Sequence, residues 1–71
     1  MANVYLQKNR EQRVYGGHPW VFRSDIDHVE GQARDGSVVR VLSSRHKFLG
    51  MAVYNPRSQI TLRMLSRRDI S

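Results

Sequence analysis

The chain has 71 residues, enough for one small domain, and it has no cysteine to form a disulfide or to ligate a metal as a thiolate. Twelve lysines and arginines stand against six aspartates and glutamates, which gives a formal net charge of +6. No apolar run reaches the roughly 18 residues of a membrane span, and residues 1–10 lack the apolar stretch of a signal peptide. We therefore expect one cytoplasmic domain, residues 1–71, with no membrane partner.

Arginine supplies ten of the twelve cations. Its planar guanidinium binds phosphate through two parallel hydrogen bonds and stacks on bases, so this bias favours nucleic acid as the partner. A solvated positive surface, or an acidic neighbour that neutralises the charge, is the alternative explanation. The three histidines, His18, His28 and His46, have no metal-ligand spacing, so we expect no metal site.

The N-terminal part of the chain predicts a strand followed by a short helix. Residues 3–7 alternate between apolar and polar side chains, as a strand does. Asn9 is expected to cap a helix over residues 10–15, with Gln12 in the position of a capping-box glutamine, and two glycines end it. Val14 is expected to point into the core. A helix this short does not persist alone, so it must dock on a sheet.

The rest of the chain predicts strands. Residues 20–26 should be extended, because Pro19 biases the residue before it away from helix. Three further segments alternate cleanly and are joined by short turns; they are residues 37–43, 47–54 and 59–65. Strands this closely spaced, with no long helix between them, predict a mainly β fold with short helices that closes into a small barrel.

Trp20, the only tryptophan, directly follows a Gly-Gly-His-Pro turn at residues 16–19. It either fills a core that is short of large side chains, or the turn presents a surface to a partner. We expect Trp20 to anchor the core and to hold the preceding loop out toward a ligand. Tyr15 and Tyr54 have an apolar body and a polar tip, and the sequence leaves their roles undecided.

Catalytic motifs are absent from the sequence. It contains neither a G-x-G-x-x-G nor a G-x-x-x-x-G-K-[ST] loop for a nucleotide cofactor, and no cysteine nucleophile. Ser24, Asp25 and His28 are close in sequence, but Ser and Asp are better explained there as turn or cap residues. Asp25 and Asp27 are expected to lie on one side of a strand, in solvent. We therefore expect a chain that is not catalytic by itself and binds no cofactor.

The arginine-lined helix and the glycine loop after it are the positive signal. At helical spacing Arg10 and Arg13 share a face. Glycines let backbone N–H groups approach a phosphate closely, since no Cβ intervenes. His18 either bonds a base edge or satisfies the backbone of the turn. The candidate RNA-binding residues from this reasoning are Lys8, Arg10, Arg13, Gly16, Gly17, His18 and Arg23.

Three stretches carry a family likeness: GHPWVFRSDI at 17–26, GSVVRVLSSRHKFLG at 36–50 and YNPRSQITLRMLSR at 54–67. Together they resemble the N-terminal PUA domain of the bacterial ribosomal RNA large subunit methyltransferase I family. The resemblance implies a pseudo-barrel of about five to six strands. It also implies a parent enzyme that methylates C5 of a cytosine in 23S rRNA, with SAM bound in a catalytic domain outside this chain. One departure is His46, where the family often has a glycine.

The resemblance also implies where RNA binds. PUA domains generally contact structured RNA with the first helix, the glycine-containing loop after it and part of the last strand. By position these are residues 8–15, residues 16–18 and the strand around Arg63. Residues 66–71 break the strand pattern, as though a further domain followed, so we expect the chain to be a fragment of a larger methyltransferase.

Three functions follow from these observations. The leading hypothesis is an RNA-binding module, and the alternative is a docking element that packs on the rest of its own enzyme and has little RNA affinity alone. A free-standing enzyme is the weakest of the three. RNA binding requires the arginines to form one exposed field, whereas docking allows them to be scattered or paired with Asp25, Asp27 and Glu30.

Overall fold

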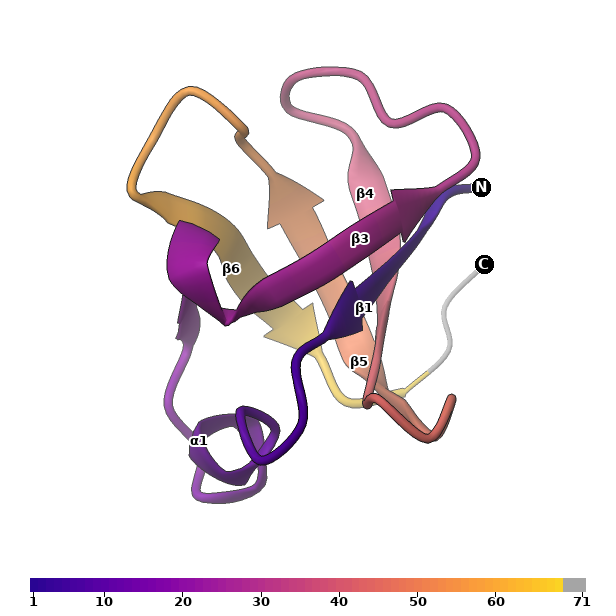
Figure 1. Cartoon of the computed structure of the whole chain (residues 1–71). Coiled ribbons are helices and arrows are strands. Elements are labelled where there is room, and N and C mark those ends of the chain that lie inside the picture. The colour runs from indigo at the N-terminus through magenta and orange to yellow at the C-terminus, as the bar shows by residue number, and fades with distance from the viewer. Residues whose placement is uncertain (69–71) are drawn as a thin grey trace.

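The computed structural model describes residues 1–68, which form one curled sheet with very little helix (Figure 1). The spatial order of the strands is β2-β6-β5-β4-β1-β3. Only the pair β1 and β4 is parallel; the other four pairs are antiparallel. The predicted mainly β fold is confirmed. The elements are β1 Asn3–Leu6, α1 Gln12–Tyr15, β2 Trp20–Phe22, the 3₁₀ turn η1 Arg23–Asp25, β3 Ile26–Glu30, β4 Val38–Leu42, β5 Phe48–Tyr54 and β6 Ile60–Ser66.

The core lies inside the curl of the sheet and is built mainly from valine and leucine. Every antiparallel pair contains a shift of register, and such bulges bend strands so that a sheet can wrap around its own core. Val14 is the only α1 residue that is buried, as predicted, and it docks the helix on this core. The buried core residues are Ala2, Val4, Leu6, Val14, Val21, Val39, Val41, Leu49, Ala52 and Leu62.

Gly50 allows β5 and β6 to approach closely. A Cβ on this residue would lie 2.5 Å from the carbonyl oxygen of Ser66 and 2.7 Å from the terminal methyl of Met64. The backbone of Gly50 also has a φ of +156°, which side chains rarely permit. A glycine is therefore required here for the end of β6 to reach its position.

The helix begins later than predicted, and Asn9 does not cap it. Asn9 adopts a left-handed φ of +70°, and the N-cap position is held by Glu11 without a side-chain bond. Gln7 is anchored by its backbone N–H, which donates to the carbonyl of Asp25 at 2.8 Å, and the Arg10 N–H donates to the Gln7 carbonyl at 3.0 Å and closes a turn that contains Asn9. The chain must therefore turn sharply before the helix starts, and Asn tolerates the left-handed region better than most residues.

Residues 20–26 are not one extended segment, which corrects the prediction. The 3₁₀ turn at Arg23–Asp25 separates β2 from β3. The Asp25 carboxylate fixes this turn, because its Oδ2 accepts the backbone N–H of Phe22 at 3.2 Å. Asp25 is 4% exposed, so the expectation that it lies in solvent is wrong.

Trp20 does not anchor the core. It is 41% exposed, whereas its neighbour Val21 is 2% exposed. Because side chains alternate along a strand, the burial of Val21 against Leu62 turns Trp20 to the outer face, where its cross-strand partner is Arg63. Only one of two neighbouring residues on β2 can face the core. That residue is Val21, which fits the small interior of the curled sheet, and Trp20 therefore faces outward.

Residues 69–71, which include part of the C-terminal segment in which the strand pattern breaks, lie outside the described residues. The hairpin at residues 43–47 is described fully. There His46 adopts a left-handed φ of +66°, a backbone conformation that favours glycine. The His46 ring packs against Tyr5, with 4.7 Å between the ring centroids.

Candidate nucleic-acid interface

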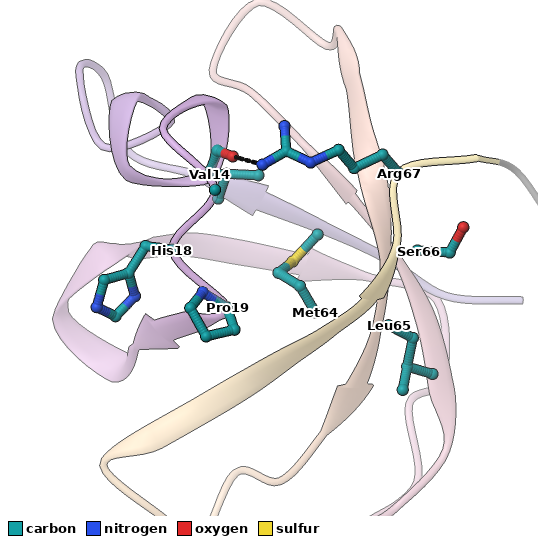
Figure 2. Close-up of a pocket in the computed structure, with 8 residues that line it drawn as sticks. Val14, His18, Pro19, Met64, Leu65, Ser66 and Arg67 are labelled. Carbon is teal, nitrogen blue, oxygen red and sulfur yellow. Dashed lines mark hydrogen bonds between the residues drawn. The ribbon is translucent and has the colours of Figure 1, made fainter.

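The loop after α1 and the end of β6 enclose a cavity of about 220 Å³. Figure 2 shows the Met64 and Leu65 side chains on opposite sides of β6, with Met64 on the side of Val14. The backbone N–H of Met64 donates to the carbonyl of Pro19 at 2.7 Å, so the loop is tied to the strand. The cavity is lined by Val14, Gly17, His18, Pro19, Met64, Leu65, Ser66 and Arg67.

Arg67 joins the helix to the last strand. Its Nη2 donates to the carbonyl oxygen of Val14 at 2.6 Å, as drawn in Figure 2. The Val14 carbonyl also accepts the Gly17 N–H at 3.1 Å, so Arg67 is the second donor to this oxygen at the end of the helix. Sequence reasoning missed Arg67, because no local pattern connects a residue beyond the last strand with a helix carbonyl 53 positions earlier.

The glycine loop closes the helix. The backbone N–H of His18 donates to the carbonyl of Arg13 at 2.9 Å, and that of Gly17 to Val14 at 3.1 Å. These two bonds, with Gly17 at a φ of +90°, form a Schellman motif. The N–H of Gly16 donates to Gln12 at 2.9 Å. The backbone N–H groups of the glycine loop, which were expected to bind a phosphate, are therefore already bonded to the helix. A ligand can contact the surface of the loop and its side chains, but not these N–H groups.

Arg10 and Arg13 share one buried carboxylate. Arg10 Nη1 lies 3.6 Å from Asp25 Oδ1, and Arg13 Nη1 lies 3.9 Å from Asp25 Oδ2. The aspartate side chain is 6% exposed, but the two arginine side chains are 53% and 51% exposed. Arg13 also lies over the Phe22 ring, 5.2 Å from its centroid. The two arginines and the aspartate together carry one net positive charge. The buried carboxylate restrains both guanidinium groups, which remain half exposed.

An exposed row crosses β2 and β6 next to this cavity. The backbone N–H of Trp20 donates to His18 Nδ1 at 3.2 Å, and the two rings meet edge to face at 6.1 Å. Arg63 lies opposite Trp20 in the register. Leu65, two residues further along β6, is 56% exposed. The outer face therefore presents an indole, an imidazole, a guanidinium and an isobutyl group together.

Lys8 and Arg23 lie elsewhere. Lys8 lines a second cavity, which lies between residues at and before α1 and the hairpin at 43–47 and shares no residue with the first. Arg23 Nη2 donates to the carbonyl of Pro56 at 2.9 Å, and Arg23 lines a hollow of its own with β3 and β5 residues. Of the other predicted residues, Gly17 and His18 line the first cavity, and Arg63 lies opposite Trp20 in the register. Arg10 and Arg13 meet at Asp25, and Gly16 ends the helix between them and the loop.

Two candidate centres do not form among the described residues: a triad of Ser24, Asp25 and His28, and a cluster of metal ligands. Asp25 is engaged by the two arginines, and His28 Nδ1 lies 2.6 Å from Asp27 Oδ2 instead, so Ser24, Asp25 and His28 do not form a triad. Within residues 1–68 no three side chains of His, Cys, Asp or Glu come together as metal ligands. The same part of the chain has no helix of the length and apolar character needed to cross a membrane.

The sequence model of a family described as a PUA-like domain matches residues 4–67. The chain belongs to this PUA-like domain family. It is 43% identical over 72 residues to a ribosomal RNA large subunit methyltransferase I of Vibrio vulnificus strain CMCP6, covering 99% of this chain and 18% of the relative. A protein of the same name from Tolumonas auensis is 43% identical over 63 residues, covering 89% of this chain and 16% of that relative.

A solved structure shares the fold of this PUA-like domain. It comes from Streptococcus mutans and is described as a candidate SAM-dependent methyltransferase. The TM-score is 0.75 at 19% identity, and the match covers all of this chain and 18% of the other. At this identity the likeness shows the fold alone. The PUA-like domain thus spans only 16–18% of the length of these relatives.

Proposed function

We propose that this PUA-like domain is the RNA-binding module of a SAM-dependent methyltransferase that modifies cytosine C5 in 23S rRNA. The chain is then one part of a larger protein and supplies substrate recognition. The observation that carries the proposal is the pair of half-exposed arginines, Arg10 and Arg13, that the buried Asp25 holds beside α1. The names of the relatives supply the class of RNA.

The arginine pair suits the RNA backbone. A guanidinium binds phosphate through two parallel N–H bonds, and a side chain that is already held loses less freedom when it binds. Asp25 holds both arginines by their Nη1 atoms, and about half of each side chain remains exposed. Each phosphate that is neutralised releases counterions, so binding must weaken as salt rises.

The exposed row on β2 and β6 suits unstacked bases. RNA loops are commonly recognised by aromatic side chains and guanidinium planes on which bases stack. Trp20 is exposed on this face, with His18 at its edge and Arg63 opposite. The cavity beside it would receive a group that protrudes from the RNA. The domain then reads RNA shape, with phosphate contacts from Arg10 and Arg13.

The methyl transfer itself belongs to the remainder of the parent protein. Cytosine C5 becomes nucleophilic when a cysteine thiolate adds to C6, and this chain has no cysteine. The described residues do not fit SAM either. They contain one four-residue α-helix and lack the strand–helix crossovers at which open α/β sheets bind nucleotide cofactors.

The decisive experiment measures binding of the chain to a structured fragment of large-subunit rRNA across a salt series. Simple removal of Arg10 and Arg13 would strand a buried carboxylate, so the test variant is Arg10→Gln/Arg13→Gln/Asp25→Asn. We expect weaker binding and a log–log salt slope that is shallower by roughly 0.7 to 0.9 for each phosphate that the variant no longer neutralises.

The matched control is Arg34→Gln/Asp35→Asn/Arg57→Gln, which also removes two cations and one anion. Arg57 Nε pairs with Asp35 Oδ2 at 3.0 Å, and Figure 1 shows the loops that carry these residues at the far end of the sheet from α1. The control should retain the wild-type slope. Equal losses in both variants would mean that net charge alone governs binding and would contradict the proposed face.

A docking element is the second candidate function, and the exposed apolar side chains favour it. Trp20 and Leu65 are 41% and 56% exposed on one face of the β2–β6 pair, and the relatives are more than five times longer than this chain. In that case, wild type and both charge variants would bind RNA equally poorly at every salt concentration.

A further inference from the structure

A second cavity, of about 250 Å³, lies between residues at and before α1 and the hairpin at residues 43–47. We infer that it binds one unpaired nucleotide whose base donates an amino N–H to Glu11. This inference rests on the proposed RNA-binding function and adds a subsite to it. The cavity is lined by Lys8, Asn9, Glu11, Tyr15, Ser43, Ser44, Arg45 and Lys47.

Glu11 supplies the most specific observation. Its Oε2 is shielded from solvent and accepts no hydrogen bond from the described residues. Glu11 holds the N-cap position of α1, but its side chain makes no capping bond. Buried polar groups in folded proteins nearly always have a partner, and one without a partner calls for an explanation. A ligand that brings an N–H donor to this cavity would provide that partner once the carboxylate rotates toward it, because Oε2 is itself shielded.

Three cations line the same cavity: Lys8, Arg45 and Lys47. None of them forms an ion pair within 4.0 Å of Glu11 among the described residues. The three cations would repel a metal ion, and the carboxylate would repel a bare phosphate close to it. The arrangement therefore suits a ligand that carries an anionic group and a separate N–H donor.

The hairpin side of the cavity is fixed by Ser43. Ser43 is buried, and its hydroxyl oxygen accepts the backbone N–H groups of Arg45 at 3.2 Å and Lys47 at 3.1 Å. The backbone N–H of Ser43 also donates to the carbonyl of Lys47 at 2.9 Å. The two cationic residues of the hairpin thus start from a rigid turn, which a binding site requires.

The helix side of the cavity supplies an aromatic ring. Tyr15 is 49% exposed, and the Lys47 ammonium lies over its ring, 5.5 Å from the centroid. A base that stacks on Tyr15 would displace Lys47 toward the attached phosphate. Stacking on aromatic side chains is the usual way in which proteins hold unstacked bases. The cavity is smaller than the sites that hold drug-sized ligands, which suits a single nucleotide.

The carboxylate selects among bases. Cytosine, adenine and guanine carry an exocyclic amino group that donates to a carboxylate, as in the recognition of cytosine N4 by Glu or Asp. Uracil presents its imino N–H between two carbonyl oxygens, which the carboxylate repels. We therefore expect the cavity to prefer a base with an amino group over uracil.

The test compares the binding of short single-stranded RNAs, a uridine pentamer and the same pentamer with a central cytidine or adenosine, to the whole chain. Wild type should prefer the amino-bearing oligonucleotides by roughly fivefold or more. Glu11→Ala should abolish the preference. Glu11→Gln should reduce it, since an amide both donates and accepts. Glu30→Gln, which removes the same charge from the end of β3, should leave it unchanged.

Thermal unfolding of each variant separates binding from folding. Since Oε2 has no partner among the described residues, Glu11→Gln should unfold at or above the wild-type temperature. A preference that persists in Glu11→Ala, or no preference in wild type, would overturn the inference even if structured RNA bound with the expected salt dependence. A preference that depends on Glu11 while the Arg10 and Arg13 variants leave RNA binding unchanged would support this site and count against the proposed face.

Discussion

Arg67 Nη2 donates to the carbonyl oxygen of Val14 at 2.6 Å and so joins the end of β6 to the last turn of α1. The same guanidinium lies beside Gly17, where a Cβ would be 3.5 Å from Nη2. The position of the glycine loop therefore depends on a residue on the far side of the cavity. This bond and the bond from the Met64 N–H to the Pro19 carbonyl connect the loop to the last strand.

Arg67→Ala should weaken the connection between the glycine loop and the last strand. We expect a loss of unfolding free energy of about 1–2 kcal/mol, since bonds to charged groups contribute more than neutral ones but this one is only partly buried. Urea denaturation measures the change. Arg68→Ala is the matched control, because Arg68 is exposed and its bond to Ser66 Oγ comes from the backbone N–H, which alanine keeps. Similar losses in both variants would show that the bond from Arg67 to Val14 contributes no stability.

Asp25→Asn should move stability and RNA affinity in opposite directions. The buried carboxylate pairs with Arg10 and Arg13 and accepts the Phe22 N–H, so its replacement should cost about 1–3 kcal/mol of unfolding free energy. The same change adds one positive charge to the surface, and at low salt we expect this added attraction to exceed the loss of the restraint that Asp25 places on both arginines. RNA affinity at low salt should therefore rise, as a binding titration alongside denaturation would measure.

Asp27→Asn provides the comparison for that prediction. Asp27 lies two residues away with a side chain that is 61% exposed, and its carboxylate lies beside the half-exposed His28 ring. The same change of net charge there should leave stability within about 0.5 kcal/mol of wild type. If Asp27→Asn raised RNA affinity as much as Asp25→Asn, the arginine pair would have no special part in binding.

Sequence reasoning predicted most of the fold because its strongest signals are local. Alternation located the strands that became β4, β5 and β6, and the spacing of Val14 placed it in the core. The errors arose where distant residues decide. Asn9 turns left-handed because Gln7 is bonded to Asp25, and Trp20 faces outward because Val21 meets Leu62. Neither pairing can be read from neighbouring residues.

The sequence predicted which elements meet at the candidate interface, but not the hydrogen bonds and buried groups that hold them together. The basic helix, the glycine loop and the last strand do meet, and Figure 1 shows α1 below the curled sheet. The hydrogen bonds that occupy the N–H groups of Gly16, Gly17 and His18 were not expected, and neither was the burial of Asp25. Both depend on how the loop closes against the rest of the fold, which composition and spacing do not specify.

Gly50→Ala should be strongly destabilising. The new methyl would meet backbone at 2.5 Å, so β5 and β6 would have to separate, and we expect a loss of about 2–4 kcal/mol. Gly36→Ala is the comparison, because Gly36 has a φ of +81° and no atom within 4 Å of a Cβ. Backbone strain alone should cost about 1–2 kcal/mol there. Equal unfolding temperatures for the two variants would contradict the close approach.

Trp20→Ala should separate binding from folding. The side chain is 41% exposed, so its removal should cost about 2 kcal/mol of stability, less than the loss of a fully buried tryptophan. If a base stacks on the indole, affinity for structured RNA should fall by about 1–3 kcal/mol. Leu62→Ala, which removes a fully buried side chain opposite Val21, should instead cost about 2–5 kcal/mol of stability.

Chemical denaturation and RNA titration of the two variants measure this contrast. Trp20→Ala should remain folded and bind more weakly, and Leu62→Ala should show the larger loss of stability while its folded fraction binds as wild type does. A Trp20→Ala domain that folds and binds RNA with unchanged affinity would remove the indole from the interface. The exposed Trp20 and Leu65 would then be better explained as a surface that packs against another protein segment.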